Sequence, residues 1–466
     1  MRKRLVVAVV VVTLLVAPVV AQKRDQAIPG KFRGADAASP NDKTSIGDLK
    51  WFEVFKDQEL QQLVRTAIVQ NYDSRAAIAR INAARANLGF ARSEQFPQIY
   101  GSADLPTTRN SKNGPLGAFT SGGGARSIGD FFLNLLSFEL DVWGRVRQQK
   151  KAAREELRAS EEDRKAVLTT VVGDVAAGYF TLIALDNELE ISKRTLATRE
   201  ESLRIIELRQ QGGLATLLEV RQAEELVYQA SQTIPDTERA LEQTENLISL
   251  LLGNNPGAIK RGRPLGQQEV LTEVPAGLPS DLLARRPDIR SAEAILEANG
   301  AFVSVAKKAY FPRISLTGNS GFQSNALSSL FTGASRAWTF IPEVTAPIFT
   351  GGRLKSNVNF ARAQQDLALV QYQQTIQNAF REVSDALVQY RKMKEVRVQQ
   401  ELLVTALRDR SRLAYLRYQG GVDSLLNALD SDRELFDAEL NLTQTKRNEL
   451  LSLVQLYKAL GGGWQS

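Results

Sequence analysis

Residues 208–218 read LRQQGGLATLL, and residues 416–426 read LRYQGGVDSLL. Each stretch contains a pair of adjacent glycines, Gly212-Gly213 in the first and Gly420-Gly421 in the second. Glycine just past the end of a helix allows the backbone to leave the helical path. We therefore predict that each glycine pair separates two helices, and that the chain turns back on itself at both places.

The distance of 208 residues between the two stretches recurs elsewhere in the chain. At this offset Gly144-Arg145 corresponds to Gly352-Arg353, Tyr228 to Phe436, and Leu252-Gly253 to Leu460-Gly461. A constant offset over about 110 residues predicts two copies of one structural unit. Further upstream the offset becomes 215, since Phe96-Pro97 corresponds to Phe311-Pro312, so we expect a longer loop in the first copy.

The sequence before each glycine pair is typical of a very long helix. Residues 145–209 contain no proline and only two glycines, and they are rich in Ala, Glu, Leu, Arg and Lys, which favour helices. A helix of this length extends roughly 100 Å and needs partner helices along its side. We predict helices over residues 145–211, 214–252, 353–419 and 422–460. Taken alone, such helices are also typical of a structural coiled coil.

Shorter segments before the long helices alternate between apolar and polar residues, which predicts strands over residues 98–105, 131–142, 313–323 and 337–349. In the segment over residues 313–323 one face carries Ile314, Leu316 and Phe322. In the segment over residues 337–349 one face carries Trp338, Phe340, Val344, Ala346 and Ile348. In the segment over residues 131–142 the apolar face is predicted to carry Phe132, Leu136, Phe138, Leu140 and Val142. Loops rich in Gly, Ser and Asn, residues 106–128 and 324–336, join the strands of each pair.

Alternating strands of about ten residues are typical of an outer-membrane β-barrel, although a half-buried sheet in a soluble protein alternates in the same way. Aromatic residues near the strand ends favour the membrane interpretation, because aromatic side chains concentrate at membrane interfaces. These residues are Phe96, Tyr100, Trp143, Tyr310, Phe311 and Phe349. Four strands cannot close a barrel, and open strand edges do not survive in lipid. A membrane-spanning protein would therefore have to be an oligomer.

Composition excludes many kinds of enzyme. The 466 residues include no His and no Cys, so thiolate or imidazole metal sites, Cys–His nucleophiles and Ser-His-Asp triads are absent. Paired acids such as Glu155-Glu156 and Glu161-Glu162 look like solvated helix faces. We expect no enzymatic activity, no cofactor and no metal.

The N-terminus reads as a secretory signal peptide, with Arg2-Lys3-Arg4, an apolar run from Leu5 to Val20, and cleavage expected after Ala21. No other run of apolar residues is long enough to predict a transmembrane helix. Without residues 1–21 the chain has 56 basic and 52 acidic residues, so its charge gives no case for nucleic-acid binding.

These patterns divide the chain into five parts. They are a signal peptide (1–21), an N-terminal extended segment (22–58), a first repeat (59–253), a linker (254–279) and a second repeat (280–466). In each repeat we expect one helix, two strands, one long helix, a break and a final helix.

Several longer motifs resemble the TolC-like outer-membrane factors, most closely the channel subunits of resistance-nodulation-division (RND) multidrug efflux systems. The matching stretches are WFEVFKD (51–57), LTEVPAGLPSDLL (271–283), RRPDI (285–289), YFP (310–312), PIF (347–349) and YKALGGGW (457–464). The similarity extends from about residue 50 to the C-terminus.

This resemblance implies a mainly α fold with a β-barrel part. Three identical chains would contribute four strands each to one twelve-stranded barrel, above a long helical tube that crosses the periplasm. Such proteins are passive exit ducts for drugs, linked by a periplasmic membrane-fusion (adaptor) protein to an inner-membrane RND pump. The duct of a type I protein secretion system has the same architecture and remains an alternative, as does a soluble periplasmic coiled-coil scaffold.

In this family the tube closes at its periplasmic tip, which the glycine pairs should form here. Matching to the family motif assigns the gate to Asp430, Leu426, Arg417 and Tyr418, with Asp423 as a further candidate. Rings of carboxylates around a narrow axis attract cations and repel anions. Relatives carry a basic residue where Gln419 stands, so the closing network is expected to be weaker here. Many relatives also carry a lipid-modified cysteine, and since this chain has none, we expect the barrel alone to hold it in the membrane.

Overall fold

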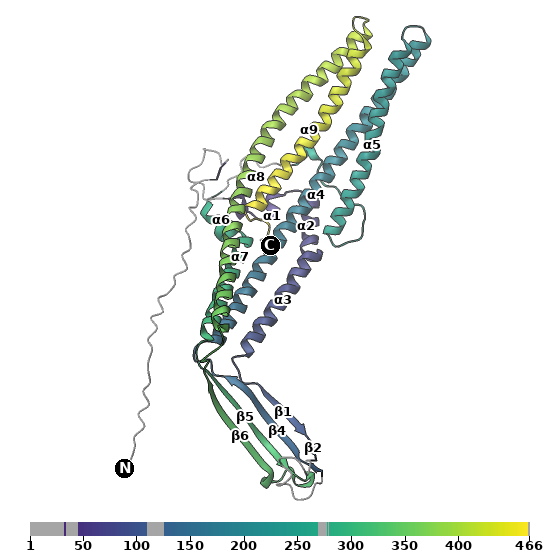
Figure 1. Cartoon of the computed structure of the whole chain (residues 1–466). Coiled ribbons are helices and arrows are strands. Elements are labelled where there is room, and N and C mark those ends of the chain that lie inside the picture. The colour runs from purple at the N-terminus through teal and green to yellow at the C-terminus, as the bar shows by residue number, and fades with distance from the viewer. Residues whose placement is uncertain (1–31, 34–44, 110–124, 269–276, 278, 465–466) are drawn as a thin grey trace, which may run out of the picture.

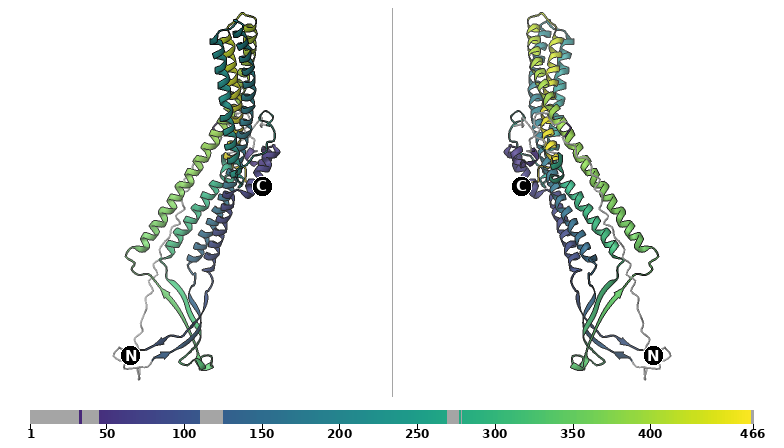
Figure 2. Two further views of the ribbon diagram at one scale, coloured as in Figure 1. Left: turned by 90° about the vertical axis from the view of Figure 1, so that its right-hand side faces the viewer. Right: turned by 90° about the vertical axis from the view of Figure 1, so that its left-hand side faces the viewer.

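The computed structural model describes residues 32–33, 45–109, 125–268, 277 and 279–464. The molecule is elongated, with two long helical hairpins at one end and a β-sheet at the other (Figure 1). Short helices and the C-terminal residues lie beside the middle of the long helices (Figure 2). The predicted signal peptide, residues 1–21, and much of the predicted loop 106–128 lie outside the described residues.

The two hairpins have the same dimensions. The first consists of α4 (Arg145–Gln211) and α5 (Leu217–Leu251), and the second of α8 (Arg353–Gln419) and α9 (Leu425–Ala459). The long helices have 67 residues and the shorter ones 35 in both copies, and all four keep the 208-residue offset. Helices α5 and α9 begin three residues later than predicted, because Thr216 and Ser424 take extended conformations as N-caps.

The hairpin tips turn on the second glycine of each pair. Gly213 and Gly421 both have a φ of 72°, in the left-handed region that favours glycine, whereas Gly212 and Gly420 have negative φ. After α4, the Leu214 amide donates to the Arg209 carbonyl at 2.8 Å. The same bond joins Val422 to Arg417 after α8 at 3.0 Å. Both helix ends are therefore closed in the same way, by backbone bonds that satisfy carbonyls of the last turn.

The prediction of a single helix before each strand pair is wrong, because the structure has two helices at each of these places. In the first repeat they are α2 (Gln58–Gln70) and α3 (Tyr72–Ser93), and in the second α6 (Pro279–Arg285) and α7 (Pro287–Lys308). The Asn71 side chain breaks the first by accepting bonds from the Asp73 and Ser74 amides. Proline cannot continue a helix from the residue before it, so Pro287 begins a new one.

Smaller elements complete the described chain. Helix α1 (Trp51–Val54) lies in the segment predicted as extended. Two short strands, β2 (Thr107–Thr108) and β3 (Arg126–Ser127), pair within the first inter-strand loop. Single 3-10 turns are formed by Ile46–Asp48, Leu265–Gln267, Leu327–Ser329 and Gly333–Ser335.

The main sheet is antiparallel, with strand order β1-β4-β5-β6. Its strands are β1 (Ile99–Asp104), β4 (Gly129–Glu139), β5 (Arg313–Ser324) and β6 (Arg336–Thr345). The order joins the two repeats side by side through β4 and β5 and leaves β1 and β6 as edges. Strands β4 and β6 end earlier than predicted, so Leu140 to Val142 and Ala346 to Phe349 lie outside them.

The pairing register divides the sheet into two unlike faces. One face is apolar over most of its area and carries Ile99, Phe131, Leu133, Leu135, Phe138, Leu316, Phe322, Trp338, Phe340 and Val344. The opposite face carries Ser102, Asp104, Asp130, Asn134, Asn319, Gln323 and Thr339. Alternation therefore predicted the faces of β5 and β6.

The predicted faces of β4 were partly wrong. A bulge shifts the register between Leu135 and Phe138, where Ser137 has a φ of 31°. Phe132 consequently lies on the polar face, next to Asn134, whereas Phe131 and Leu133 lie on the apolar face. The prediction assumed that apolar and polar residues alternate without interruption along β4. The bulge adds residues between Leu135 and Phe138, so that both side chains lie on the apolar face.

The hydrophobic core lies at the middle of the molecule, where α2, α4 and α9 meet. Leu60, Val175, Tyr179 and Leu456 are each fully buried there. One window of α4 is long and apolar enough to cross a membrane by length and composition alone, although its apolar residues do not form the single continuous run that the prediction considered. However, 67% of that window is buried inside the protein, so α4 is the central core helix.

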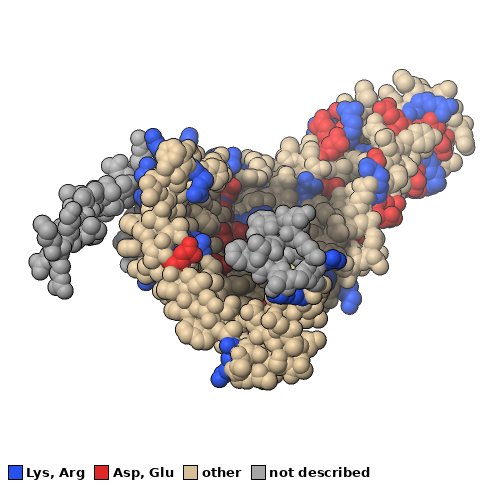
Figure 3. All heavy atoms as spheres, turned by 60° about the horizontal axis from the view of Figure 1, so that its bottom comes forward, with Lys and Arg blue, Asp and Glu red and all other residues tan. Residues whose placement is uncertain are grey.

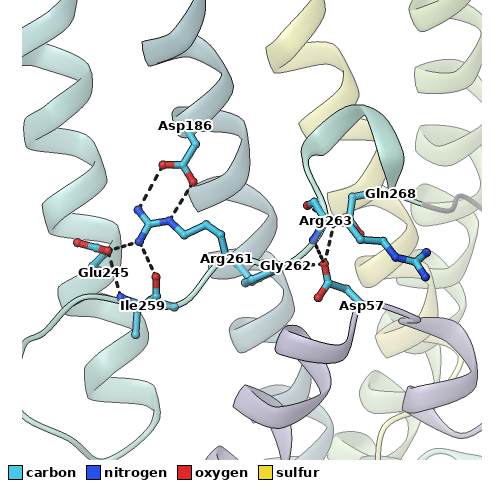
Figure 4. Close-up of polar contacts among 9 residues, drawn as sticks. Asp57, Asp186, Glu245, Ile259, Arg261, Gly262, Arg263 and Gln268 are labelled. Atoms are coloured by element: carbon cyan, nitrogen blue, oxygen red, sulfur yellow. Dashed lines mark hydrogen bonds and ion pairs between the residues drawn. The ribbon is translucent and has the colours of Figure 1, made fainter.

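The carboxylate of Asp57 binds the linker between the two repeats to this core (Figure 4). The Asp57 carboxylate caps α2 and accepts bonds from the Tyr179 hydroxyl (2.9 Å), the Arg263 amide (2.9 Å) and the Gln268 side chain (3.0 Å). Nearby, Arg261 forms ion pairs with Asp186 of α4 and Glu245 of α5. Residues 254–268 of the linker are thus bound to the first repeat and to Asp57 of the N-terminal segment by two polar clusters.

Candidate functional site

Two of the predicted gate residues meet in the loop at the tip of the second hairpin. The Arg417 guanidinium lies 3.0 Å from Asp423, whose carboxylate also accepts bonds from the Asn427 side chain and the Ser424 amide. These bonds, of which the one from Arg417 is the strongest cause, lower the pKa of Asp423 below its ordinary value. Asp423 is thus an ionised link between the end of α8 and the start of α9.

Asp430 belongs to a second polar group, two turns further along α9. It pairs with Arg433 on the same helix and lies 3.7 Å from Arg410 of α8. Arg410 also pairs with Glu434. Asp430 therefore contacts neither Arg417 nor Asp423 within the chain, and the gate residues predicted as one network form two.

Leu426 and Tyr418 have different surroundings. The Leu426 side chain is 56% exposed and lies one turn before Asp430 on α9, so both side chains share one face of the helix. Tyr418 packs beside the apolar cluster at the tip, under the guanidinium of Arg209 from the first hairpin at 4.9 Å. Tyr418 thus joins the two hairpins, whereas Leu426 and Asp430 present an open face.

The two tips differ in charge although their backbones match. At the first tip Ala215 and Gln222 stand where the second has Asp423 and Asp430. The helix after the first glycine pair is capped by Thr216 and Glu219, which bond to each other's backbone amides. At these two positions only the second hairpin carries acidic side chains.

Sequence reasoning missed Arg410, Arg433 and Asn427 as partners of the gate candidates. The spacing of Asp430 and Arg433, three residues apart on one helix, was a usable signal. Arg410 could not be found in this way, because its proximity depends on how α8 and α9 pack.

The strand end of the molecule carries the exposed aromatic residues predicted there. Trp143 stacks on Phe311 with ring centroids 5.1 Å apart, and its indole N–H donates to the Pro312 carbonyl at 2.7 Å. Phe96, Tyr310 and Phe349 are also exposed where helices and strands join. Seen from this end, the sheet region has few charged side chains, in contrast to the distant hairpins (Figure 3).

Within the described residues, no group of three or more His, Cys, Asp or Glu side chains could hold a metal ion. The candidate site is a set of charges at a helical tip, and a sheet with one apolar face lies at the opposite end of the molecule.

The profile of the outer membrane efflux protein family matches residues 63–254 and 278–462. The chain belongs to this family. The two matched ranges each contain one complete hairpin and one pair of main-sheet strands, so both copies take part in the match.

Curated relatives in this family are named as efflux pump components. The solvent efflux pump outer membrane protein SrpC of Pseudomonas putida is 39% identical over 88% of this chain and 87% of its own length. Outer membrane protein OprJ of Pseudomonas aeruginosa is 36% identical, over 92% of this chain and 89% of its own length. These names favour the efflux interpretation over a protein secretion duct or a soluble scaffold.

Solved structures agree with this family fold. A membrane protein from Pseudomonas aeruginosa gives a TM-score of 0.85 at 34% identity, covering 93% of this chain and 99% of that protein. The MtrE outer membrane channel of Neisseria gonorrhoeae gives 0.85 at 30% identity, covering 94% and 96%. The predicted fold class is confirmed: this outer membrane efflux protein is mainly helical with a β part, and it has the fold of the trimeric outer-membrane efflux channels.

Proposed function

We propose that this protein is the outer-membrane exit channel of a tripartite efflux pump, through which small molecules leave the periplasm passively. The observation that carries the proposal is the four-stranded sheet, with an apolar face, a polar face and two open edges. In lipid, every backbone hydrogen-bonding group of a strand needs a partner. Edge strands β1 and β6 are satisfied if three chains join edge to edge into one barrel, with the polar faces lining a pore.

The long hairpins then form the periplasmic part of the channel. Helices α4 and α8, with 67 residues each, extend roughly 100 Å beyond the barrel. A channel of this length reaches components that lie in the periplasm. Its partners are accordingly a periplasmic membrane-fusion (adaptor) protein and an inner-membrane RND pump, the latter supplying the energy.

We assign the periplasmic gate to the tip of the second hairpin. Three copies of Asp430 around the axis would form a carboxylate ring, and three copies of Leu426, exposed one turn nearer the tip, an apolar constriction. The Arg417–Asp423 pair fixes the loop that precedes α9, the helix that carries both residues. A narrow ring of this kind holds the closed channel shut and makes its residual conductance cation-selective.

The test is single-channel recording in planar bilayers. Asp430→Ala removes the ring carboxylates and frees Arg433, while Arg410 keeps its ion pair with Glu434, so we expect higher conductance and weaker cation selectivity. Asp236→Ala is the matched control, because Asp236 pairs with Arg239 three residues on in the same local geometry but lies on α5, away from the tip. Unchanged conductance and selectivity in Asp430→Ala would refute the gate assignment.

A second experiment tests the exit-channel function. The protein is cross-linked in native membranes and its partners are identified after purification. An inner-membrane efflux pump together with an adaptor is the expected result. Recovery of a one-step protein secretion transporter instead would overturn the proposal.

A further inference from the structure

The loop between β5 and β6, residues 325–335, lies at the end of the sheet away from the helices (Figure 1). In this loop the Phe331 ring lies edge-on to the rings of Phe322, with centroids 5.6 Å apart, and Phe131, at 5.8 Å. Phe322 and Phe131 are directly opposite each other in the strand register and belong to the apolar face. The loop therefore folds over the end of the apolar face and not over the polar face.

This loop combines a buried leucine with two exposed apolar side chains. Leu330 is 7% exposed and packs against Gly129 of β4. Leu327 and Phe331 are 64% and 68% exposed. The loop is thus fixed to the sheet through Leu330, and it presents an apolar surface that continues the apolar face of the sheet.

The polar side chains of the loop bond to one another. The Ser324 and Ser329 hydroxyls lie 2.8 Å apart, and the hydroxyls of Thr332 and Ser335 both donate to the Ser329 carbonyl at 2.8 Å. Polar groups that leave water need such partners, because an unsatisfied group in an apolar medium is costly. These hydroxyls can therefore lie beside lipid without losing their hydrogen bonds.

Arg336, the first residue of β6, interrupts the apolar face. The register places it opposite Phe322, and it lies two residues before Trp338 on the same face of the sheet. It is the only charged residue on this face in the described strands. Its side chain is exposed, and no described carboxylate forms an ion pair with it. Its charge is therefore available to a group outside the chain.

The position of Arg336 along the strand corresponds to the membrane surface. An arginine on the lipid face is costly at the middle of the bilayer and costs little near the bilayer surface. Trp338, which is 76% exposed, follows on the same face, and tryptophan concentrates at membrane interfaces. The ten residues of β6, tilted as barrel strands are, span roughly 25 Å, which is the height of an apolar band. Arg336, at the start of this strand, therefore lies level with lipid headgroups.

The headgroups at this level belong to the outer leaflet. The long helices leave the sheet at its other end and extend into the periplasm, so the loop end of the sheet faces the exterior (Figure 2). The outer leaflet of a Gram-negative outer membrane consists mainly of glycolipids that carry phosphate groups on their sugars. A guanidinium binds phosphate through two parallel hydrogen bonds, so arginine matches such a group in shape and charge.

We propose that Arg336 binds a phosphate group of an outer-leaflet glycolipid, whose acyl chains contact Phe331 and Trp338. The inference rests on the barrel proposed above, with the apolar face toward lipid. Phe331 contacts Phe322, which lies opposite Arg336, so the arginine and the exposed ring are at the same level of the sheet. One lipid per chain can therefore use the charge and the apolar surface together.

The test is to titrate the purified channel, freed of lipid in non-ionic detergent, with diphosphorylated lipid A and to count bound lipids by native mass spectrometry. Wild type should bind one lipid A per chain. Arg336→Gln should bind it about tenfold more weakly, because the charge-assisted bonds to phosphate are lost. Lipid A without phosphate should bind both proteins equally weakly. Arg126→Gln on β3 is the matched control, since Arg126 is an exposed arginine at the same end of the molecule but outside the main sheet, and this variant should bind like wild type.

Bilayer recording of the same preparations separates the two ways to fail. Equal lipid A binding by wild type and Arg336→Gln, with both proteins conducting, overturns the lipid site and leaves the channel proposal intact. An equal loss of binding in Arg126→Gln also overturns the site, since it indicates diffuse attraction by basic residues. Phosphatidylglycerol bound as tightly as lipid A overturns the assignment to a glycolipid. A wild-type protein that neither conducts nor binds lipid A overturns both proposals.

Discussion

Asp57 shows at the scale of a single residue why the linker stays against the core. Burial would raise the pKa of this carboxyl, but bonds from Gln268, Arg263 and Tyr179 together hold it below its ordinary value. The Tyr179 hydroxyl in turn accepts a bond from the Gly262 amide at 2.8 Å. No sequence signal identified this cluster, since Asp57 is 122 residues from Tyr179 and 211 from Gln268. Only the residues around it, WFEVFKD, stood out by resemblance.

Asp57→Asn should destabilise the protein by about 2 kcal/mol, because the amide nitrogen, whichever carboxylate oxygen it replaces, then faces N–H groups that can only donate. Thermal unfolding of the purified channel measures the change. Asp281→Asn on α6 is the control, since among the described residues its carboxylate makes only a weak bond, 3.4 Å from the neighbouring Ser280 hydroxyl. Equal unfolding temperatures for wild type and Asp57→Asn would contradict this role.

The same cluster predicts a dependence on pH. The pKa of Asp57 is lower in the folded protein than in the unfolded chain, where it is near ~3.9. Its contribution is therefore complete above that value and is lost as the pH falls through the folded-state pKa. The stability difference between wild type and Asp57→Asn should be constant between pH 6 and 8, and should shrink below about pH 4.

At the scale of elements, helices were easier to predict than breaks and bulges. The ends of α4 and α8 followed from proline-free sequence and paired glycines, because helix propensity acts locally. The division into α2 and α3 depends on the side chain of Asn71, and that into α6 and α7 on Pro287. The β4 bulge had no signal in the sequence, since its position depends on pairing with β5. The same limit applies to the gate, whose Arg410 comes from a neighbouring helix.

The paired glycines should differ in their tolerance of a side chain. Gly213→Ala places an L-residue at a φ of 72°, which costs about 1 kcal/mol, although no atom lies within 4 Å of the added carbon. Gly212→Ala should have little effect, because its φ of −78° suits any residue. Hydrogen exchange at the first tip measures the difference, and equally fast opening in both variants would contradict it.

At the scale of the whole molecule, the apolar face of the sheet is the surface expected to contact lipid, and the polar face is expected to line the pore. Phe340 lies on the apolar face and Thr339, its neighbour in β6, on the polar face. The overall architecture could be predicted from sequence, because alternation and duplication are long-range patterns. The open edges at β1 and β6 could not, because the order of the strands depends on how the two repeats pair through β4 and β5.

Phe340→Arg should impair assembly into the outer membrane, since arginine on the lipid face costs about 2–4 kcal/mol at the middle of the bilayer. Thr339→Arg should still assemble and should shift ion selectivity toward anions. The amount of protein in the outer-membrane fraction measures the first effect, and bilayer recording the second. Normal assembly of Phe340→Arg together with failure of Thr339→Arg would reverse the assignment of the faces.

The identical lengths of the paired helices restrict how this protein can evolve. A single residue inserted into one hairpin would shift its tip by about 1.5 Å and rotate everything beyond the insertion by about 100°. Corresponding residues of α5 and α9 would then no longer lie at equivalent positions, and the two tips would no longer be at the same height. Insertions and deletions in the hairpins are therefore expected to occur as matched pairs in the two repeats, while the loops between the strands remain free to change length independently.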